Sequence, residues 1–316
     1  MNSMNCNYLI VHKISYKYIS RIVDYIYEQL KKHSLLNVEF ILCDDINDVN
    51  LEFNSTVYII GDLFDNFYKT KNCKYVFLNF SVLYVIGNPM NCSFNAYRKI
   101  RKKKKIFESK IKCFDFILDF WPLQTFLLQN EFSIPVKYFP VGVNLDNLNI
   151  NEKTTDRKYD LCFVGSMTNR REKLLNKIES LGLEITPYKN VIFEEKAMES
   201  KIVLNVHAHR SNHIEMPRII GAFASKSALV TEFNSNLSKL VMSDCYISNT
   251  YNKLMPQIEF LLVNPNEINT VATNGFNWIN NNYLIKCEIE WKKIIEDIYF
   301  HFYEFNSLLN PIYPKK

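Results

Sequence analysis

The sequence predicts an α/β protein with two domains, each built around a parallel β-sheet. Short apolar runs that suit buried strands alternate with amphipathic runs that suit helices, and this alternation occurs once in each half of the chain. A polar stretch with few large apolar residues, 145–157, separates the halves and is the predicted linker. The length of 316 residues also exceeds what a single hydrophobic core usually supports.

The first predicted domain covers residues 1–144. Its apolar runs predict five strands, and its amphipathic and basic runs predict three helices. The strands are expected at 7–14, 37–44, 55–62, 74–80 and 114–120, and the helices at 19–33, 94–111 and 122–129. Residues 136–144, which contain the turn-prone Pro140 and Gly142, end this domain.

The second predicted domain covers residues 158–284, where the alternation restarts. We expect strands at 158–166, 200–208 and 229–231, and helices at 171–182 and 214–223. Gly182 suits the C-terminal end of the first of these helices. The final segment, 285–316, begins with an aromatic-rich helix. That helix either packs back on the first domain or forms an interface with another chain.

The composition excludes several classes of protein. Eight scattered cysteines form no CxxC pair and no cluster with histidine, which argues against a zinc site or a disulfide framework and for a reducing compartment. Seven glycines leave no GxGxxG motif and no P-loop motif. No apolar run approaches the roughly 20 residues of a membrane span, and the N-terminus lacks the pattern of a secretory signal. We therefore expect a cytoplasmic protein.

Ligands of parallel α/β sheets bind beyond the C-terminal ends of the strands. In FVGSMTNRREK, a predicted strand ends at the Gly165-Ser166 turn and a helix follows. Backbone N–H groups at such a turn and at a helix N-terminus attract anions, and Arg170, Arg171 and Lys173 add positive charge nearby. A diphosphate fits this pattern. The alternative is that Arg171 and Lys173 belong to the solvated face of the helix.

A second strand end lies in LNVHAHR, which delivers His207 to the same edge of the sheet. His209 and His213 are close in sequence and suit a polar loop. The chain has no HExxH motif and no carboxylate at ligand spacing from these histidines. We therefore expect no metal site.

A third segment, HIEMPRIIGAFASKSALVTE, places Glu215 and Glu232 at the two ends of a helix and a strand. Arg218 follows Glu215 by one helical turn. Without a ligand, this arrangement would amount to a helix ion pair worth a few tenths of a kcal/mol and an exposed Glu232.

These segments, in this order, resemble the donor-binding domain of GT-B-fold glycosyltransferases of the glycosyl-transferases-group-1-like families. The resemblance is specific over roughly 136–245, from YFPVGVN to beyond the strand that ends Val-Thr-Glu, and it is weak in the first half. It implies two Rossmann-like domains that face a central cleft. It also implies a nucleotide-sugar donor with no cofactor and no metal, because basic side chains and a helix N-terminus stabilise the leaving diphosphate.

The resemblance implies a donor-binding set whose members approach the diphosphate, the sugar or the ribose: Gly165, Ser166, Arg170, Lys173, His207, Glu215, Arg218 and Glu232. The Gly-Ser turn would pack against the diphosphate, which Arg170 or Lys173 would neutralise. Glu215 would lie near the sugar hydroxyls, and Arg218 would pair with it or reach the phosphates. Glu232 would accept hydrogen bonds from the ribose.

Two positions depart from the family pattern. Gly221 stands where many relatives have a glutamate, and Lys226 stands where many have a glycine. The nucleotide pocket then depends on Glu232 to replace the lost ribose contact. If Glu232 does not do so, the chain is instead a non-catalytic relative that binds a nucleotide-sugar or a glycan.

The acceptor side is represented by His12 and Asp62, each of which follows a predicted strand. A transferase that inverts the sugar needs a general base to take the proton of the acceptor, and either residue is a candidate. Both also suit ordinary loop positions.

The run YRKIRKKKKIFESKIK, residues 97–112, has three interpretations. It suits an anionic membrane surface, where each Lys or Arg contributes about 1 kcal/mol. It also suits a solvated helix face, the commonest fate of such runs. Nucleic acid ranks third, because Tyr97 and Phe107 alone provide aromatic rings for stacking on bases.

The sequence therefore predicts a cytoplasmic glycosyltransferase of the hexosyltransferase type. Peripheral association with the inner face of the membrane through residues 97–112 stays open, beside the leading interpretation of that run as a solvated helix face. Its acceptor would be a glycan, a lipid-linked glycan or a protein. The alternatives are a non-catalytic binding relative and a nucleic-acid-binding protein that uses residues 97–112.

Overall fold

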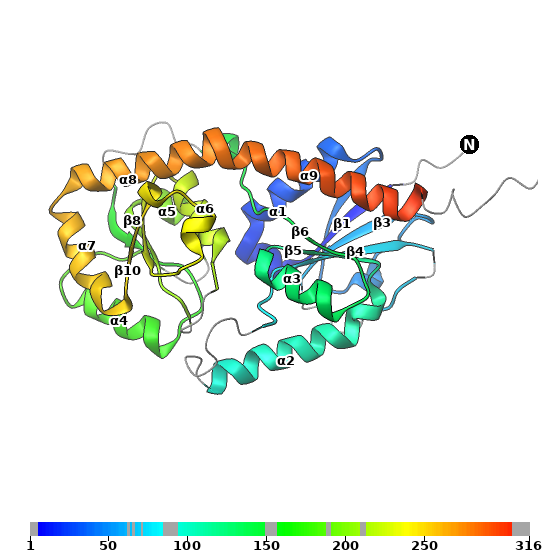
Figure 1. Cartoon of the computed structure of the whole chain (residues 1–316), viewed down its shortest axis with the longest axis horizontal. Helices are drawn as coiled ribbons and strands as arrows, with labels where there is room; N and C mark the ends of the chain where they lie inside the picture. Colours follow the sequence, from blue (N-terminus) through cyan, green and yellow to red (C-terminus); the bar gives the residue numbers. More distant parts are fainter. Residues whose placement is uncertain are drawn as a thin grey trace, which may run out of the picture. The chain divides into compact units, whose positions relative to one another are not determined.

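The computed structural model describes residues 6–61, 64, 67–70, 72–84, 94–148, 157–187, 191–208 and 213–304. These residues form two compact units, and each contains one parallel β-sheet with helices packed on it (Figure 1). The first unit comprises Met1–Tyr84, Arg101–Pro140 and Lys286–Lys316, and the second comprises Val85–Ile100 and Val141–Ile285. The predicted α/β class with two parallel sheets is confirmed.

The first unit contains a six-stranded parallel sheet in the order β2-β1-β3-β4-β5-β6. Its strands are β1 (Asn7–His12), β2 (Val38–Cys43), β3 (Thr56–Ile60), β4 (Lys74–Asn79), β5 (Phe116–Asp119) and β6 (Val136–Tyr138). Most residues of the inner strands are buried, because helices cover both faces. The direction of strand addition reverses between β1 and β3, a place where ligands often bind in such sheets.

Four helices pack on this sheet: α1 (Lys13–His33), α2 (Phe94–Lys110), α3 (Pro122–Glu131) and α9 (Leu284–Tyr299). Helix α1 starts six residues before its predicted first residue. The ring of His12 accepts a hydrogen bond from the N–H of Ile14 and caps the helix. The predicted start, Ile19, is instead a kink with non-helical backbone angles (φ −135°, ψ 27°).

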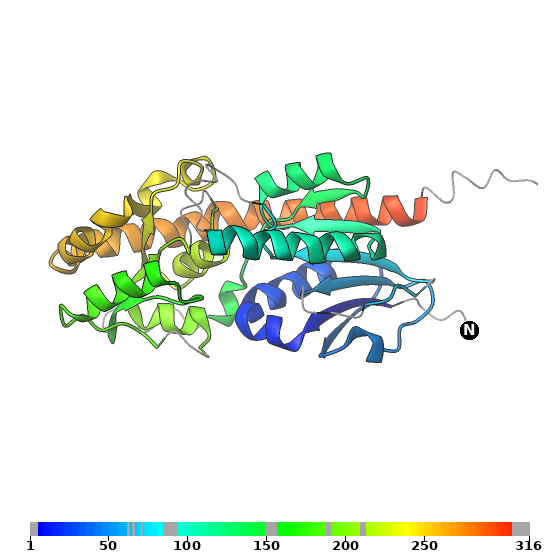
Figure 2. The same cartoon turned by 90° about the horizontal axis from the view of Figure 1, so that it is seen from below.

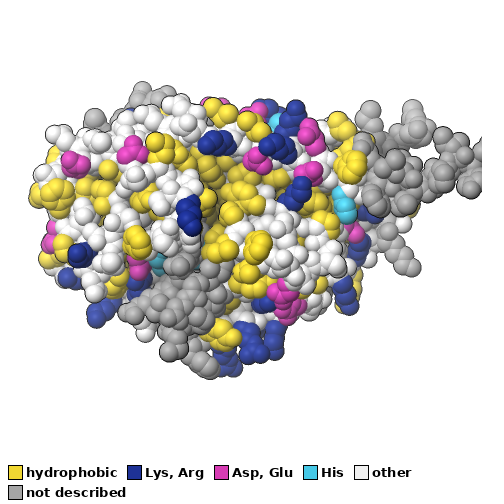
Figure 3. Space-filling view, viewed as in Figure 1, with side chains coloured by type: hydrophobic (Ala, Val, Ile, Leu, Met, Phe, Trp, Pro, Cys, Tyr) yellow, Lys and Arg dark blue, Asp and Glu magenta, His cyan; other side chains and the backbone are white. Residues whose placement is uncertain are grey.

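Helices α2 and α3 lie on one face of this sheet (Figures 1 and 2). Phe107 of α2 and Leu128 of α3 share a buried cluster with Phe77 and Ile117 from the strands. The face of α2 that points away from the sheet is rich in Lys and Arg side chains, some of which Figure 3 shows at the lower edge.

The C-terminal segment covers the opposite face of the same sheet. The indole N–H of Trp291, a fully buried residue of α9, donates to the carbonyl of Pro140 at 3.1 Å. The ring of Phe302 packs edge-on against Phe116 of β5. Farther along, the hydroxyl of Tyr303 lies 3.0 Å from that of Thr56. The buried residues of this segment, among them Trp291 and Phe302, are therefore part of the core of the first unit.

A buried carboxylate organises the C-terminal ends of β4 and β5. Asp119 is fully buried and accepts hydrogen bonds from the side chains of Asn79 (2.6 Å) and Gln124 (2.8 Å) and from the N–H of Trp121 (2.9 Å). The two amide side chains also bond the backbone of Ser81. Burial raises the pKa of Asp119 to about 6 despite these three donors.

The second unit contains a four-stranded parallel sheet in the order β10-β9-β8-β7. Its strands are β7 (Tyr159–Cys162), β8 (Ser200–Asn205), β9 (Ala228–Glu232) and β10 (Tyr246–Asn249). Its helices are α4 (Asn169–Glu179), α5 (Phe193–Met198), α6 (Met216–Ala224), α7 (Leu254–Leu262) and α8 (Pro265–Trp278). Residues of α4 and α7 share one core cluster with the sheet, and residues of α5 and α6 share the other.

The turn between α6 and β9 contains Lys226, one of the two departures from the family pattern. Lys226 has a φ of +50°, a left-handed conformation that L-residues rarely adopt. The N–H groups of Lys226 and Ser227 bond the carbonyls of Phe223 and Ala222, so this residue ends the helix in the way that glycine usually does. The position thus favours glycine, although a lysine occupies it.

We expect Lys226→Gly to raise the free energy of unfolding by about 0.5–1 kcal/mol. The left-handed conformation costs a non-glycine residue ~1–2 kcal/mol, and the greater freedom of glycine in the unfolded chain offsets part of that gain. Urea unfolding measures the change. Lys226→Ala, which loses the same amine but keeps Cβ, is the control. If the glycine and alanine variants were equally stable, the left-handed backbone at position 226 would not be a source of strain.

Asp119 predicts a pH dependence of stability. Because its pKa is higher in the folded chain than in the unfolded chain, where it is about 4, its contribution to stability is complete below about pH 4 and is lost as pH rises through about 6. We expect the difference in unfolding free energy between the wild type and Asp119→Asn to shift by up to ~3 kcal/mol across this window, in favour of the variant at the higher pH. Exposed Asp244→Asn should show no such shift.

Candidate functional site

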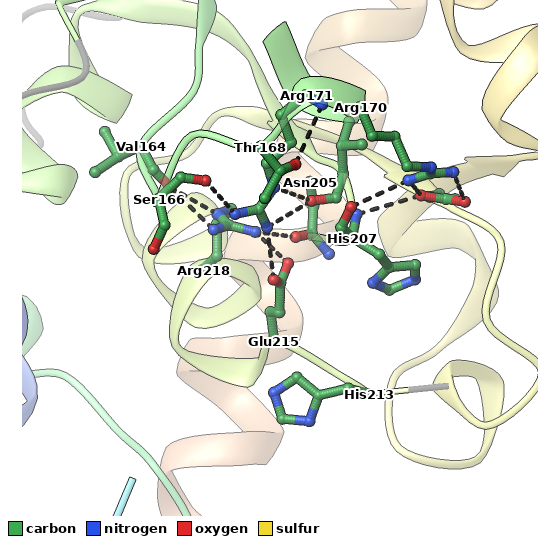
Figure 4. Close-up of polar contacts among 12 residues, drawn as sticks. Val164, Ser166, Thr168, Arg170, Arg171, Asn205, His207, His213, Glu215 and Arg218 are labelled. Atoms are coloured by element: carbon green, nitrogen blue, oxygen red, sulfur yellow. Dashed lines mark hydrogen bonds and ion pairs between the residues drawn. The ribbon is translucent and has the colours of Figure 1, made fainter. Parts of the chain in front are cut away.

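Polar side chains converge at the C-terminal ends of β7, β8 and β9 in the second unit (Figure 4). The chain after β7 turns at Gly165 and enters α4, whose N-cap is Thr168. Beyond β8 and β9 lie His207 and Glu232, and Glu215 precedes α6. Two groups of ion pairs hold these segments together.

The first group is centred on Arg171, whose side chain is only 3% exposed. Its guanidinium donates to the carbonyl of Val206 at 2.7 and 2.9 Å, to the carbonyl of Ser166 at 2.9 Å and to Glu215 at 2.8 Å. Burial lowers the pKa of Arg171 to about 10, which leaves it charged at neutral pH. This one side chain therefore joins the ends of β7 and β8 to the start of α6.

Glu215 is shared between two guanidinium groups. Arg218 donates to its second carboxylate oxygen, to the side-chain oxygen of Asn205 and to the carbonyl of Val164. Burial alone would raise the pKa of Glu215, but the charges of Arg218 and Arg171 outweigh burial and hold the pKa at about 2. The carboxylate is therefore ionised at every physiological pH.

Gly165 is enclosed by the same two arginines. Its φ of +157° lies outside the range that L-residues favour. A Cβ atom there would lie 2.7 Å from Nη2 of Arg218 and 3.3 Å from Nη1 of Arg171. The glycine lets the two guanidinium groups approach the turn that follows β7.

The second group joins Arg170 to Glu232. The guanidinium pairs with both carboxylate oxygens and also donates to the carbonyl of His207 at 3.0 Å. The N–H of His207 donates to Glu232 at 3.2 Å. Arg170 stacks 4.0 Å above the ring of Tyr251, whose hydroxyl bonds the carbonyl of Arg170. The two charged side chains are 17% and 12% exposed, so they border the solvent.

The imidazole of His207 is buried beside these groups. Its Nε2 has no hydrogen-bond partner in the described part of the chain. Burial lowers the pKa of His207, which favours the neutral ring. A buried polar atom without a partner costs free energy, and it often marks the place of a ligand or a water molecule.

Removal from water also lowers the pKa of His213 to about 4.

The structure brings together six of the eight residues of the predicted donor set: Gly165, Arg170, His207, Glu215, Arg218 and Glu232. The other two stand apart. Lys173 is exposed and makes no ion pair with another described residue, and the side chain of Ser166 is exposed while its carbonyl serves Arg171.

The two candidate bases have different outcomes. Asp62 lies outside the described residues. His12, at the end of β1 in the first unit, is buried, and its Nδ1 accepts from the N–H of Ile14 at 3.1 Å. In the neutral ring this bond places the hydrogen on Nε2. That nitrogen would then donate to a substrate rather than take its proton, which does not favour His12 as a general base.

Gly221 shows why a carboxylate is missing from α6. A Cβ atom at this position would lie 2.4 and 2.8 Å from ring carbons of Phe193 on α5. The ring of Phe193 therefore occupies the space that the Cβ atom of a glutamate at position 221 would need. The ribose contact of the family cannot come from position 221 unless this ring moves.

Sequence reasoning underestimated Arg171 and missed Asn205 and Tyr251. Arg171 had a usable signal, because it shares the inward face of α4 with the buried Leu174, Leu175 and Ile178 at spacings of three, four and seven residues. Asn205 and Tyr251 gave no such signal, since their roles arise from tertiary contacts alone.

Among the described residues, no three His, Cys, Asp or Glu side chains are arranged to hold a metal ion. No helix in the described ranges has the length and hydrophobicity required to cross a bilayer.

Comparison with known structures identifies the fold. Sucrose-phosphate synthase from Thermosynechococcus elongatus superimposes with a TM-score of 0.58 over 93% of this chain and 99% of that one, at 11% identity. WaaG, a glycosyltransferase of lipopolysaccharide biosynthesis, gives 0.56 over 92% and 99%, at 11% identity. HepE of Anabaena, solved with UDP-glucose, gives 0.53 over 92% and 98%, at 10% identity. The chain thus has the GT-B fold of glycosyltransferases, as its sequence predicted.

Comparison of the sequence with known proteins identifies no family for the chain. No family model matches the chain. It is 27% identical over 194 residues to the uncharacterized protein L137 of Acanthamoeba polyphaga mimivirus. That match covers 58% of this chain and 24% of the viral protein, so the chain spans about a quarter of the length of its relative.

We expect Arg171→Ala to lower the free energy of unfolding by ~3–5 kcal/mol, because it leaves Glu215 with one partner fewer and three carbonyl contacts unmade. Arg171→Lys should restore only part of the loss, since an ammonium cannot reproduce the planar fork of donors. Chemical denaturation gives the values. Lys173→Ala, two residues along the same helix, should change stability by less than about 0.5 kcal/mol. If Arg171→Ala and Lys173→Ala lowered the free energy of unfolding by similar amounts, the structural role of Arg171 would be refuted.

Proposed function

We propose that this protein is a glycosyltransferase that moves a sugar from a nucleotide-sugar to an acceptor without a metal ion. The fold, shared with glycosyltransferases including one solved with UDP-glucose, supports this class. The observation that carries the proposal is the cluster of Arg170, Arg171 and Arg218 at the strand ends of the second unit. Three guanidinium groups against two carboxylates leave an excess positive charge where a diphosphate would bind.

The cluster suits a leaving nucleoside diphosphate. Arg171 and Arg218 are held in place by backbone carbonyls, so their charge is oriented before a substrate arrives. The N-terminus of α4 adds partial positive charge at the same turn. Such preorganised positive charge stabilises the diphosphate as the bond to the sugar breaks, a task that a metal ion performs in other enzymes.

Arg170 and Glu232 give the site a second state. A phosphate oxygen would compete with Glu232 for Arg170, because both are anionic acceptors of the same donors. Once released, the carboxylate of Glu232 would be able to accept hydrogen bonds from the ribose hydroxyls. The unpartnered Nε2 of His207 offers a third contact, to a hydroxyl or phosphate oxygen of the donor. Glu215 and Lys173 remain proposed neighbours of the sugar and the phosphates.

The acceptor would be a glycan, a lipid-linked glycan or a protein, and the donor sugar a hexose. In the first unit His12 would orient the acceptor through Nε2, and Asp62 is the proposed base of an inverting reaction. We place the protein in a reducing compartment, consistent with seven free cysteines in the described residues. The cytoplasm meets this condition.

A non-catalytic relative is the second candidate, and the packing of Gly221 favours it. Because Phe193 fills the place of the family glutamate, the nucleotide pocket lacks one expected carboxylate. A protein that binds the nucleotide-sugar but does not transfer the sugar would have this feature. Turnover, measured as release of free nucleoside diphosphate with and without acceptor glycans, separates the two candidates.

Calorimetric titration with UDP, GDP, CDP and ADP tests the donor site. We expect one nucleotide to bind and Arg170→Gln to weaken its binding by about tenfold or more, because hydrogen bonds between charged groups contribute ~1.5–3 kcal/mol. Lys177→Gln, which removes an exposed cation near the other end of α4, is the matched control and should bind like the wild type.

Binding of inorganic pyrophosphate tests the contacts to the phosphates separately from the contacts to the ribose. Glu232→Gln should weaken the binding of the nucleoside diphosphate but not the binding of pyrophosphate, because only the former ligand carries a ribose. Activity that survives EDTA is expected if no metal is used. No binding across the nucleotide panel, or binding that Arg170→Gln leaves unchanged, would refute the proposed site.

A further inference from the structure

The positive charge of this protein is concentrated on one helix. Residues 97–112 contain nine Lys and Arg residues and one glutamate, a formal charge of +8. The whole chain carries +5, so the remaining residues together carry −3. The basic character of the protein is therefore a local property of α2 and the turn that follows it.

The cations of α2 are arranged along its outward face. Arg98, Arg101, Lys102 and Lys105 occupy helical positions i, i+3, i+4 and i+7, and we call them the basic stripe. All four are exposed, and none forms an ion pair within the described ranges. Lys104, on the inward side, instead pairs with Glu131 at 2.7 Å. Some of the Lys and Arg side chains over α2 are visible in Figure 3.

Buried contacts fix the orientation of the helix. Phe107 is 6% exposed and packs its ring 6.0 Å from those of Phe77 and Phe132. Lys110 donates to the carbonyl of Phe64, and Lys104 lies 4.3 Å above the ring of Tyr84. These contacts hold the inner face of α2 against the first unit, so the basic stripe points away from the sheet.

The basic stripe lowers the stability of its own helix. Like charges at i,i+3 and i,i+4 repel, and only one acid, Glu108, lies in the run to relieve them. The four unpaired cations lie on one face of the helix within about two turns. An extended anionic surface would neutralise all four at once.

We propose that the outward face of α2 docks on an anionic lipid bilayer. Tyr97 and Ile106 flank the basic stripe, are 43% and 38% exposed, and provide apolar groups that enter the headgroup layer. Nucleic acid fits less well: Phe107 is buried, which leaves Tyr97 as the one exposed ring of the run for stacking on bases. This inference goes beyond the proposed transferase activity and does not depend on it, since docking needs no substrate.

Sedimentation with vesicles tests the docking surface. The vesicles are phosphatidylcholine alone, or phosphatidylcholine with phosphatidylserine at about one part in three. We expect the wild type to bind only the anionic vesicles, and to be released as NaCl rises from about 0.1 M to about 1 M. Each cation near the surface contributes about fivefold in affinity. The quadruple variant R98Q/R101Q/K102Q/K105Q should therefore bind at least a hundredfold more weakly.

The control removes the same charge from elsewhere. K177Q/K239Q/K253Q/K286Q neutralises four exposed lysines dispersed over other helices and should bind the anionic vesicles nearly as well as the wild type. Equal loss in both variants would mean that net charge alone matters and would overturn the proposal. Failure of the wild type to bind, or tighter binding to a DNA or RNA duplex than to the vesicles, would also overturn it. Glutamine suits helices, so circular dichroism should show both variants folded.

Discussion

One buried cation, Arg171, holds three segments of the second unit together. Taking a guanidinium group out of water costs several kcal/mol, and it is tolerated only where acceptors surround it. Arg171 meets this condition with two carbonyls and a carboxylate, which come from the ends of β7 and β8 and from the start of α6. Because these acceptors must all be in place for the cation to be stable, the three segments are held in register with one another. Gly165 is part of the same constraint, since a larger residue would push the guanidinium groups away.

Sequence patterns predicted the elements whose burial is continuous and missed several whose burial is partial. All strands of the first unit except β6 fall within predicted ranges. The inner strands are covered on both faces and appear as nearly uninterrupted apolar runs, and the partly exposed edge strand β2 was predicted as well. The strand β10 is only half-buried along its length, and α8 contains Asn, Thr and Gly residues with weak helix propensity, so neither produced a clear pattern. The early start of α1 was missed because its N-cap is a histidine, which is not among the usual capping residues.

The candidate site was predictable in position but not in detail. The rule that ligands bind at strand ends selected one edge of the second sheet, and six of the eight predicted residues do meet there. What the sequence could not provide was the pairing. The spacing of Arg171 from Leu174, Leu175 and Ile178 indicates that it is buried, but it does not indicate that Glu215 is its partner. Likewise, Tyr251 reaches Arg170 from 81 positions away. Electrostatic pairing of this kind depends on distances that only the folded chain defines.

The first unit begins earlier in the sequence, but the second unit is completed first during synthesis. The second unit is nearly contiguous in sequence, so almost all its strands and helices are available once residue 285 has been synthesised. The first unit begins earlier but lacks Trp291 and Phe302 until the last helix emerges, and both side chains belong to its core. Until then its sheet exposes the apolar face that this helix covers. During synthesis the N-terminal sheet is therefore the part of the protein that waits longest for its native packing, and the part most open to aggregation or to a chaperone.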